Sequence, residues 1–338
     1  MNFNFTEDQT LFRDSVREFL RNEVTPDYIR QRWEGKAETL WPQLAEMGLT
    51  GVTVPEAHGG LGMGLADFVL LAEECGYVAL PEPLTRTAMV AVPLLSQAAS
   101  AREDAGEWLA AIASGELIAA VGLENALVED ADRAGLLLIQ QGEQMAAVLS
   151  GEFSAEKNES VDPSRQLFSV AARGGESLAV SSEHALDLGA LACAAESLGL
   201  AQRMVDMTVA YTADRQQFGK PVGSFQAVKH HMADVAVKLE YARGPVYRAA
   251  WALDAGADNA SVYVSHAKLA AAEAAALAAK NSIQCHGAMG YTWEVDLHIY
   301  MKRAWALAGA WGDTGHHKQR IGNALFEQDL PLGAGATF

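Results

Sequence analysis

The stretch Tyr211-Thr-Ala-Asp-Arg-Gln-Gln-Phe-Gly-Lys-Pro-Val-Gly-Ser-Phe-Gln226 separates two long segments that have the apolar spacing of helices. Apolar residues recur at steps of three and four over 188–209 before it and over 225–242 after it. Within the stretch, Pro221 cannot continue a helix. The sequence therefore predicts a turn between two helices, with Arg215 at the end of the first. A cation at a helix C-terminus is also favoured by the helix dipole, so the spacing alone leaves the role of Arg215 open.

The composition is that of a globular protein and restricts the kinds of partner. The chain has 338 residues, of which half are hydrophobic, enough for two or three packed domains. Its net charge of −18 argues against nucleic acid or an anionic membrane surface as a partner. Three widely spaced cysteines in apolar surroundings favour free thiols over a disulfide framework. With no signal peptide and no apolar run of membrane-spanning length, the sequence predicts a cytoplasmic protein.

The N-terminal third has the pattern of helices. Thr6 and Gln9 have the spacing of a capping box, in which each side chain bonds the backbone of the other at the start of a helix. The apolar residues that follow indicate an amphipathic helix. Further helices are expected over 37–47, 65–76 and 88–112.

A glycine-rich run from Leu49 to Gly64 invites comparison with a dinucleotide-binding turn. Such a turn needs a third glycine at a fixed distance from the first two, to let a helix pack closely on a strand. Counted from Gly60 and Gly62, that place is occupied by Leu65. No alternating strands and helices follow, so we do not expect a Rossmann fold here.

The pattern changes between residues 116 and 180, where short apolar runs are separated by Gly, Asp, Asn and Pro. Runs of this length and spacing are typical of strands, and we expect them to form one small antiparallel sheet. The four runs are Leu117–Leu123, Gly135–Gln141, Gln144–Leu149 and Leu167–Ala172.

Helical spacing returns after the predicted sheet. Helices are expected over 187–216, 225–254 and 261–286, with a shorter one from 293, and their lengths and short connections indicate a four-helix bundle. The predicted fold is therefore mainly α with a small β domain. The predicted domains are an N-terminal helical domain (1–115), a β domain (116–184), a C-terminal four-helix bundle (185–330) and a tail (331–338).

Two motifs give the chain a resemblance to the acyl-CoA dehydrogenase family. Arg215-Gln-Gln-Phe-Gly219 is similar to the family's Arg-x-x-Phe-Gly turn. Gln284-Cys-His-Gly-Ala-Met-Gly-Tyr291 is similar to its Gln-x-x-Gly-Gly-x-Gly-Tyr segment, with Ala288 in place of the second glycine. The early Pro55-Glu-Ala-His-Gly-Gly-Leu-Gly62 also fits, and the order of the predicted domains is that of the family. The resemblance covers most of the chain.

The resemblance implies an FAD enzyme that oxidises an acyl-CoA thioester to the trans-2-enoyl-CoA. In that reaction a carboxylate removes the proton next to the thioester carbonyl, and the β hydrogen leaves as hydride to the flavin. Hydrogen bonds to the carbonyl oxygen stabilise the developing enolate charge. The family also implies an electron-transfer flavoprotein as the electron acceptor.

The resemblance further implies which residues bind FAD. Arg215 is expected on the pyrophosphate, because a guanidinium presents a fork of donors to phosphate oxygens, and Phe218 on the adenine side. In the family, this half of the site is donated to the flavin of the neighbouring subunit. The remaining residues expected to bind the cofactor are Gln226, Gln284, Gly287 and Thr314.

The chain departs from the family where the reaction needs a base. The family's catalytic Glu lies in a Tyr-Glu-Gly-Thr segment, and the matching Trp311-Gly-Asp-Thr314 has Gly312 at that place. Asp313, one place along, is the candidate base that remains in this segment, and Glu196 is a second carboxylate to consider. The two β-domain segments that line the flavin and thioester in the family, at 121–126 and 146–151, are not preserved.

These losses all concern one half of the site and lead to three alternatives. The first is that the chain works beside a paralogous complete subunit, as α2β2 with one FAD per heterodimer, on a bulky steroid or other ring-bearing acyl-CoA. The second is a homo-oligomeric enzyme that uses Asp313 or Glu196 as base. The third is a flavin-free structural partner, which the retained Arg215 argues against. The histidine pairs 230–231 and 316–317 do not have the spacing of metal ligands, and we expect surface or interface residues there and no metal site.

Overall fold

The computed structural model describes residues 3–124, 126–327 and 330. It is mainly helical with small sheets, which confirms the predicted fold class. The chain divides into two compact units, each considered by itself. Unit 1 comprises residues 1–26, 69–80 and 193–338, and unit 2 comprises 27–68 and 81–192.

Unit 1 begins with α1 (Glu7–Glu23), whose N-terminal cap is the one predicted. The Gln9 backbone N–H donates to Thr6 Oγ1 over 3.2 Å, and the Thr6 N–H donates to Gln9 Oε1 over 2.7 Å. Val16 and Leu20, one turn apart on the same face, are the residues of α1 that are fully buried. α4 (Leu65–Tyr77) contributes its C-terminal half to this unit.

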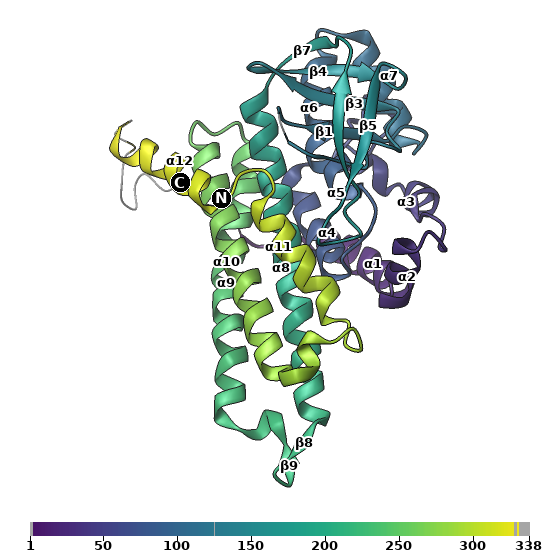
Figure 1. Cartoon of the computed structure of the whole chain (residues 1–338). Helices are drawn as coiled ribbons and strands as arrows, with labels where there is room; N and C mark the ends of the chain where they lie inside the picture. Colours follow the sequence, from purple (N-terminus) through teal and green to yellow (C-terminus); the bar gives the residue numbers. More distant parts are fainter. Residues whose placement is uncertain (1–2, 125, 328–329, 331–338) are drawn as a thin grey trace. The chain divides into compact units, whose positions relative to one another are not determined.

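Helices make up most of the rest of unit 1, and Figure 1 shows the longer ones running alongside one another. The small residues of α10 are almost continuously buried, as expected for a thin helix that neighbours approach closely. A further helix, α12, begins at Thr314 and was not predicted. None of the helices that the structure describes is both long and apolar enough to cross a membrane. The helices are α8 (Ser182–Asp214), α9 (Gln226–Asp254), α10 (Ala260–His286), α11 (Leu297–Gly309) and α12 (Thr314–Phe326), with the short η5 (Gly287–Tyr291) after α10.

Unit 2 holds shorter helices than the sequence suggested. The helix expected over 37–47 is confined to α3 (Trp41–Glu46), which starts at the proline that suits a first turn. The one expected over 88–112 is divided at residues 100–102. The glycine-rich run forms 3₁₀ turns, and the structure describes no strand between residue 3 and this run, in agreement with the prediction of no Rossmann fold. The other elements are α2 (Pro26–Trp33), η1 (Leu49–Gly51), η2 (Glu56–His58), α5 (Leu84–Arg86), η3 (Thr87–Ala91), α6 (Val92–Ala99) and α7 (Glu103–Ala113).

The prediction of one antiparallel sheet in unit 2 was wrong in two respects. The described residues of this unit form two sheets, ordered β1-β3-β4-β7 and β2-β6-β5, and β1 pairs with β3 in parallel. The parallel pairing is possible because the chain leaves for the second sheet, at β2, before it returns. The strands are β1 (Ala119–Gly122), β2 (Val128–Glu129), β3 (Leu136–Gln141), β4 (Gln144–Leu149), β5 (Phe153–Asn158), β6 (Leu167–Ala172) and β7 (Glu176–Ser181).

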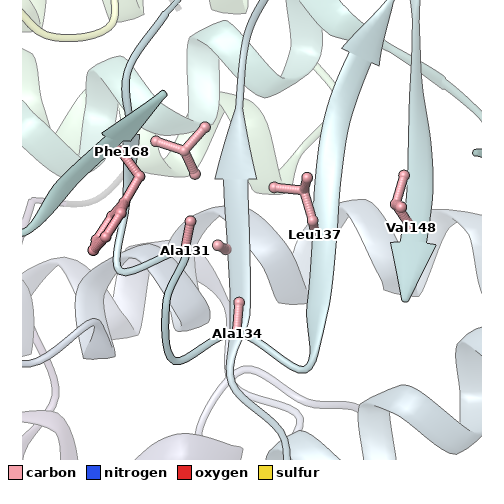
Figure 2. Close-up of a cluster of buried hydrophobic side chains, with 7 residues drawn as sticks. Ala131, Ala134, Leu137, Val148 and Phe168 are labelled. Carbon is pink, nitrogen blue, oxygen red and sulfur yellow. The ribbon is translucent and has the colours of Figure 1, made fainter. Parts of the chain in front are cut away.

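Residues of both sheets meet in a small hydrophobic core, shown in Figure 2. Leu137 and Val148 are fully buried on adjacent strands, and Phe168 joins them from the second sheet. Burying each such side chain stabilises the fold by about 1.5–3 kcal/mol. The cluster also contains three buried alanines, at 120, 131 and 134, whose small side chains allow the surrounding backbone segments to approach one another closely.

Candidate cofactor half-site and base segment

The predicted turn after α8 is a tight β-hairpin at one end of the long helices (Figure 1). β8 (Gln216–Gln217) pairs with β9 (Lys220–Pro221), and the Val222 N–H donates to the Arg215 carbonyl over 2.8 Å. The two residues between the strands, Phe218 and Gly219, have φ of 54° and 78°. Two consecutive positive φ values are the pattern of a type I′ turn, which joins antiparallel strands without splaying them.

Phe218 is exposed and held in a backbone conformation that side chains disfavour. Its exposed fraction is 91%, and its only ring contact in the described chain is an edge-on one with Phe225, at 6.1 Å between centroids. The left-handed conformation costs a residue with a Cβ about 1–2 kcal/mol. Strain of this kind together with an exposed aromatic ring indicates a binding surface.

Arg215 and Gln226 flank the same hairpin. Both side chains are exposed, Arg215 directly after α8 and Gln226 as the first residue of α9. Among the residues that the structure describes, no carboxylate forms an ion pair with Arg215. Its guanidinium is therefore available to an anionic ligand.

The second predicted segment, at the end of α10, lies beside the end of α8. The His286 imidazole stacks on the Tyr211 ring with centroids 4.2 Å apart and planes at 21°. Burial lowers the pKa of His286, so the ring is neutral at pH 7, and its Nδ1–H donates to the Ser282 carbonyl over 2.8 Å. Next to it, Gly287 has φ 60° and ψ −138°, a conformation that needs glycine. This brings the exposed Gln284 and Gly287 to the same end of the bundle as the hairpin.

This end of the bundle fits the pyrophosphate and adenine of FAD. It presents an unpaired guanidinium, an exposed aromatic ring, two exposed amides and a glycine without a side chain to block close approach. The individual roles of Arg215, Phe218, Gln226, Gln284 and Gly287 stay predictions. The described part of the chain has no group of three or more His, Cys, Asp or Glu side chains placed to hold a metal ion.

The segment between α11 and α12 is folded so that no side chain fits at position 312. Trp311 and Gly312 have φ of 55° and 89°. A Cβ on Gly312 would lie 2.7 Å from His317 Nε2 and 2.8 Å from His316 Cδ2, closer than real Cβ atoms approach. A glutamate at this place would be strained by the positive φ and would require both histidine side chains to move.

Asp313 is the N-terminal cap of α12. Its Oδ1 accepts the His316 backbone N–H over 2.8 Å, and this hydrogen bond lowers the pKa of the carboxyl group. The carboxylate is fully exposed, and Thr314 beside it is exposed as the first residue of α12. The structure thus gives Asp313 the role of a helix cap, and a catalytic role for it stays a prediction.

The base segment and the hairpin lie at opposite ends of α10. Ser265, near the start of α10, contacts His317 of α12, whereas Gln284 lies at the other end of the helix. The two positions are 284 − 265 = 19 residues apart, or about 28 Å at 1.5 Å per residue. Within one chain, Arg215 and Thr314 therefore do not converge on the same part of a ligand.

His317 was misjudged from the sequence and Glu196 was left open. His317, expected on a surface or at an interface, is fully buried, whereas His316 beside it is exposed. Adjacent residues on a helix point about 100° apart, so one of a pair can be buried and the other exposed. Glu196 is buried on α8, and its backbone lies so close to Gly76 that a Cβ there would be 2.1 Å from the Glu196 carbonyl oxygen. Glu196 therefore lies where α8 packs closely against the C-terminal end of α4.

A cluster of charged side chains that the sequence did not reveal joins α1, α4 and α9 within unit 1. Arg17 bonds Glu74 over 2.8 Å, and Arg243 forms a short ion pair with Glu73. Burial raises the pKa of Glu73 in spite of the Arg243 guanidinium beside it. These ion pairs connect helices that are far apart in the sequence. Hydrophobic periodicity does not predict such pairs, because it depends only on neighbouring residues.

Comparison with known proteins agrees with this geometry. Residues 6–116 match the profile of the acyl-CoA dehydrogenase N-terminal domain and residues 179–326 that of the C-terminal domain. The chain is 33% identical over 326 residues to the acyl-CoA dehydrogenase IpdE2 of Mycolicibacterium smegmatis, covering 95% of this chain and 100% of that one.

Two solved structures share the fold. The steroid acyl-CoA dehydrogenase variant Tcur3481-Tcur3483 G363A superposes with a TM-score of 0.86 at 24% identity, over 96% of this chain and 99% of that one. The ChsE4-ChsE5 complex of Mycobacterium tuberculosis gives 0.81 at 23% identity, over 98% and 100%. The two domain profiles and the full-length relative show that this chain belongs to the acyl-CoA dehydrogenase family, whose members are FAD-dependent oxidoreductases that act on acyl-CoA.

Proposed function

We propose that this chain is the subunit of a heteromeric acyl-CoA dehydrogenase that binds FAD but supplies no catalytic base. The observation that carries the proposal is Gly312, which stands at the place of the family's glutamate and has no room for a side chain. The neighbouring carboxylate, Asp313, is engaged as a helix cap and has a lowered pKa. A base that must accept a proton from a weakly acidic carbon acts best with a raised pKa, and the cap has the opposite effect.

The residues retained by the chain are those that hold one half of the cofactor. Arg215 would bind the pyrophosphate, Phe218 would cover the adenine side, and Gln226, Gln284 and Gly287 would complete that half. When bound, FAD supplies the acceptor for the hydride that leaves the β carbon. In this assignment the partner provides the carboxylate that removes the α proton, and this chain fixes the cofactor across the interface.

The separation of the two ends of α10 supports a second subunit. Because Ser265 and Gln284, at the two ends of α10, are about 28 Å apart along the helix axis, Thr314 beside the first end and Arg215 beside the second would serve different flavin sites when two chains associate. Gly312 lies beside Thr314, so the flavin site that this end of the chain serves would have no carboxylate base. Only the site with the partner's carboxylate would be active, which gives one FAD per heterodimer in an α2β2 assembly.

The similar proteins suggest the class of substrate and the kind of assembly. One of the structures with this fold is described as a steroid acyl-CoA dehydrogenase, and another is a complex of two differently named chains, ChsE4 and ChsE5. We infer a bulky, ring-bearing acyl-CoA as the substrate and a paralogous acyl-CoA dehydrogenase subunit as the partner. The family suggests an electron-transfer flavoprotein as the electron acceptor.

The test is the flavin content and oligomeric state of the chain purified alone and in its native complex. We expect a colourless chain alone, and one FAD per pair of unlike subunits in the complex, measured after denaturation. A homodimer of this chain with one FAD per subunit and full dehydrogenase activity would refute the proposal in favour of a relocated base. If Arg215→Ala left the flavin content of the complex unchanged, the chain would be a flavin-free structural partner instead.

A further inference from the structure

A chain of hydrogen bonds ends on the backbone of the base segment. His317 Nε2 lies 3.0 Å from the Trp311 carbonyl oxygen, and His317 Nδ1 lies 3.1 Å from Ser265 Oγ. Ser265 Oγ is in turn 3.3 Å from Arg320 Nη1. His317 and Ser265 are both fully buried. The three side chains come from α10 and α12, and His317 links the other two to the residue before Gly312.

The contacts place a proton on Nε2 of the ring. A carbonyl oxygen can only accept, so Nε2 donates to Trp311. A guanidinium can only donate, so Ser265 Oγ accepts from Arg320, and this hydroxyl can then either donate to an unprotonated Nδ1 or accept from a protonated one. The geometry thus fixes Nε2–H, and the charge of the ring decides the direction of the bond between Nδ1 and Ser265.

The surroundings oppose a second proton on the ring. Burial is the main cause that lowers the pKa of His317 to about 4, and Lys268, His316 and Arg320 add to it. Lys268 faces the ring from α10, where its ammonium bonds the Leu307 carbonyl at the end of α11. The acidic group nearby, Asp313, is exposed and caps α12. His317 therefore stays neutral over the physiological pH range.

We infer that His317 is a positioning residue: as the neutral Nε2–H tautomer it fixes Trp311 and Gly312 in their left-handed conformations and so shapes the segment that carries Thr314. The inference rests on the proposed function in one respect, that this segment faces a flavin. The ring occupies the space that a side chain at 312 would enter, because an added Cβ would lie 2.7 Å from Nε2. A return to a base-bearing segment would therefore need changes at both 312 and 317.

The first experiment reads the tautomer directly in the full chain. Selective ¹⁵N labelling of histidine with two-bond proton–nitrogen correlation distinguishes Nε2–H from Nδ1–H, and His317→Gln identifies the resonance. We expect a neutral Nε2–H ring that does not titrate between pH 8 and 5. A ring protonated on Nδ1, or one that titrates near pH 6.5, would overturn the inference.

The second experiment tests whether the ring holds the segment. Glutamine at 317 can still donate to the Trp311 carbonyl and accept from Ser265, whereas leucine fills the space without either bond. We expect His317→Leu to speed exchange of the His316 and His317 backbone amides by about fivefold, the factor for one buried hydrogen bond, with His317→Gln within twofold of the natural chain. Equal exchange in both variants would contradict a positioning role.

These readouts are independent of the flavin. Tautomer and amide exchange are measured without FAD or a partner, so the flavin stoichiometry of the complex can fail while the His317 result stands, and the reverse also holds. A His317→Leu chain that does not fold while His317→Gln does would support the inference, because both variants retain the packing volume and only glutamine retains the hydrogen bonds.

Discussion

Replacing Gly312 by alanine is expected to destabilise the chain through two separable effects. The left-handed backbone, φ 89°, costs a residue with a Cβ about 1–2 kcal/mol. The contact of 2.7 Å with His317 Nε2 adds an overpacking cost of about 1–3 kcal/mol. The free energy of unfolding should therefore fall by about 2–5 kcal/mol.

Gly256 offers a matched control in the same unit. It has φ 61°, yet nothing lies within 4 Å of an added Cβ, so Gly256→Ala should show the backbone cost alone, about 1–2 kcal/mol. Urea unfolding of the two variants and the natural chain, followed by far-UV circular dichroism, gives the three free energies. The difference between the variants measures the steric conflict at position 312.

A double-mutant cycle identifies the partner in that conflict. If the His317 ring is what the new methyl group meets, Gly312→Ala should be less costly in a His317→Ala background by about 1–3 kcal/mol. Equal losses for Gly312→Ala and Gly256→Ala, or strict additivity in the cycle, would refute the reasoning that this segment has no space for a side chain.

Three further predictions concern the cofactor half-site and the buried charges. Arg215→Ala should weaken FAD binding to the complex at least tenfold, as expected for loss of a charge-assisted bond worth about 1.5–3 kcal/mol, whereas Arg173→Ala, which removes an exposed cation directly after β6, should leave the FAD affinity unchanged. Arg243→Met should destabilise unit 1 by about 3–5 kcal/mol in thermal unfolding, because Glu73 is left buried without its partner, and adding Glu73→Leu should recover most of the loss. Because the pKa of His317 is lowered from 6.5 to about 4, the unfolded chain binds more protons than the folded one between these values. Stability should therefore fall as pH drops from 6.5 to 4, and less steeply in His317→Gln.

The sequence predicted the long helices because their apolar spacing is regular over many turns. The hairpin at Arg215 and the end of α10 were located for the same reason, since a proline and glycines interrupt that spacing. The strands β5 and β7 were missed because exposed polar residues dominate them, and the parallel pairing of β1 with β3 depends on a crossover that no local pattern records. Local periodicity reports which face of an element is buried, and pairing is decided by distant residues.

The candidate site was only partly accessible from the sequence. The motif residues Arg215 and Gln284 could be named, yet the distance between the two ends of α10 needed the fold. The burial of His317 could not be predicted, because His316 and His317 are the same residue type and the sequence does not show which of the two faces the interior. Its role depends on Ser265, 52 residues earlier in the chain, and on a backbone conformation that single residues do not encode.

The length of α10 also bears on how such a subunit can arise. Substitutions about 28 Å apart with no shared partner act almost independently on stability and binding. Under the proposed function, a duplicated gene could therefore accumulate changes at the end that holds Gly312 without disturbing the end that holds Gln284 and Gly287. The length of the helix would then let the base and the cofactor contacts be lost or kept one at a time.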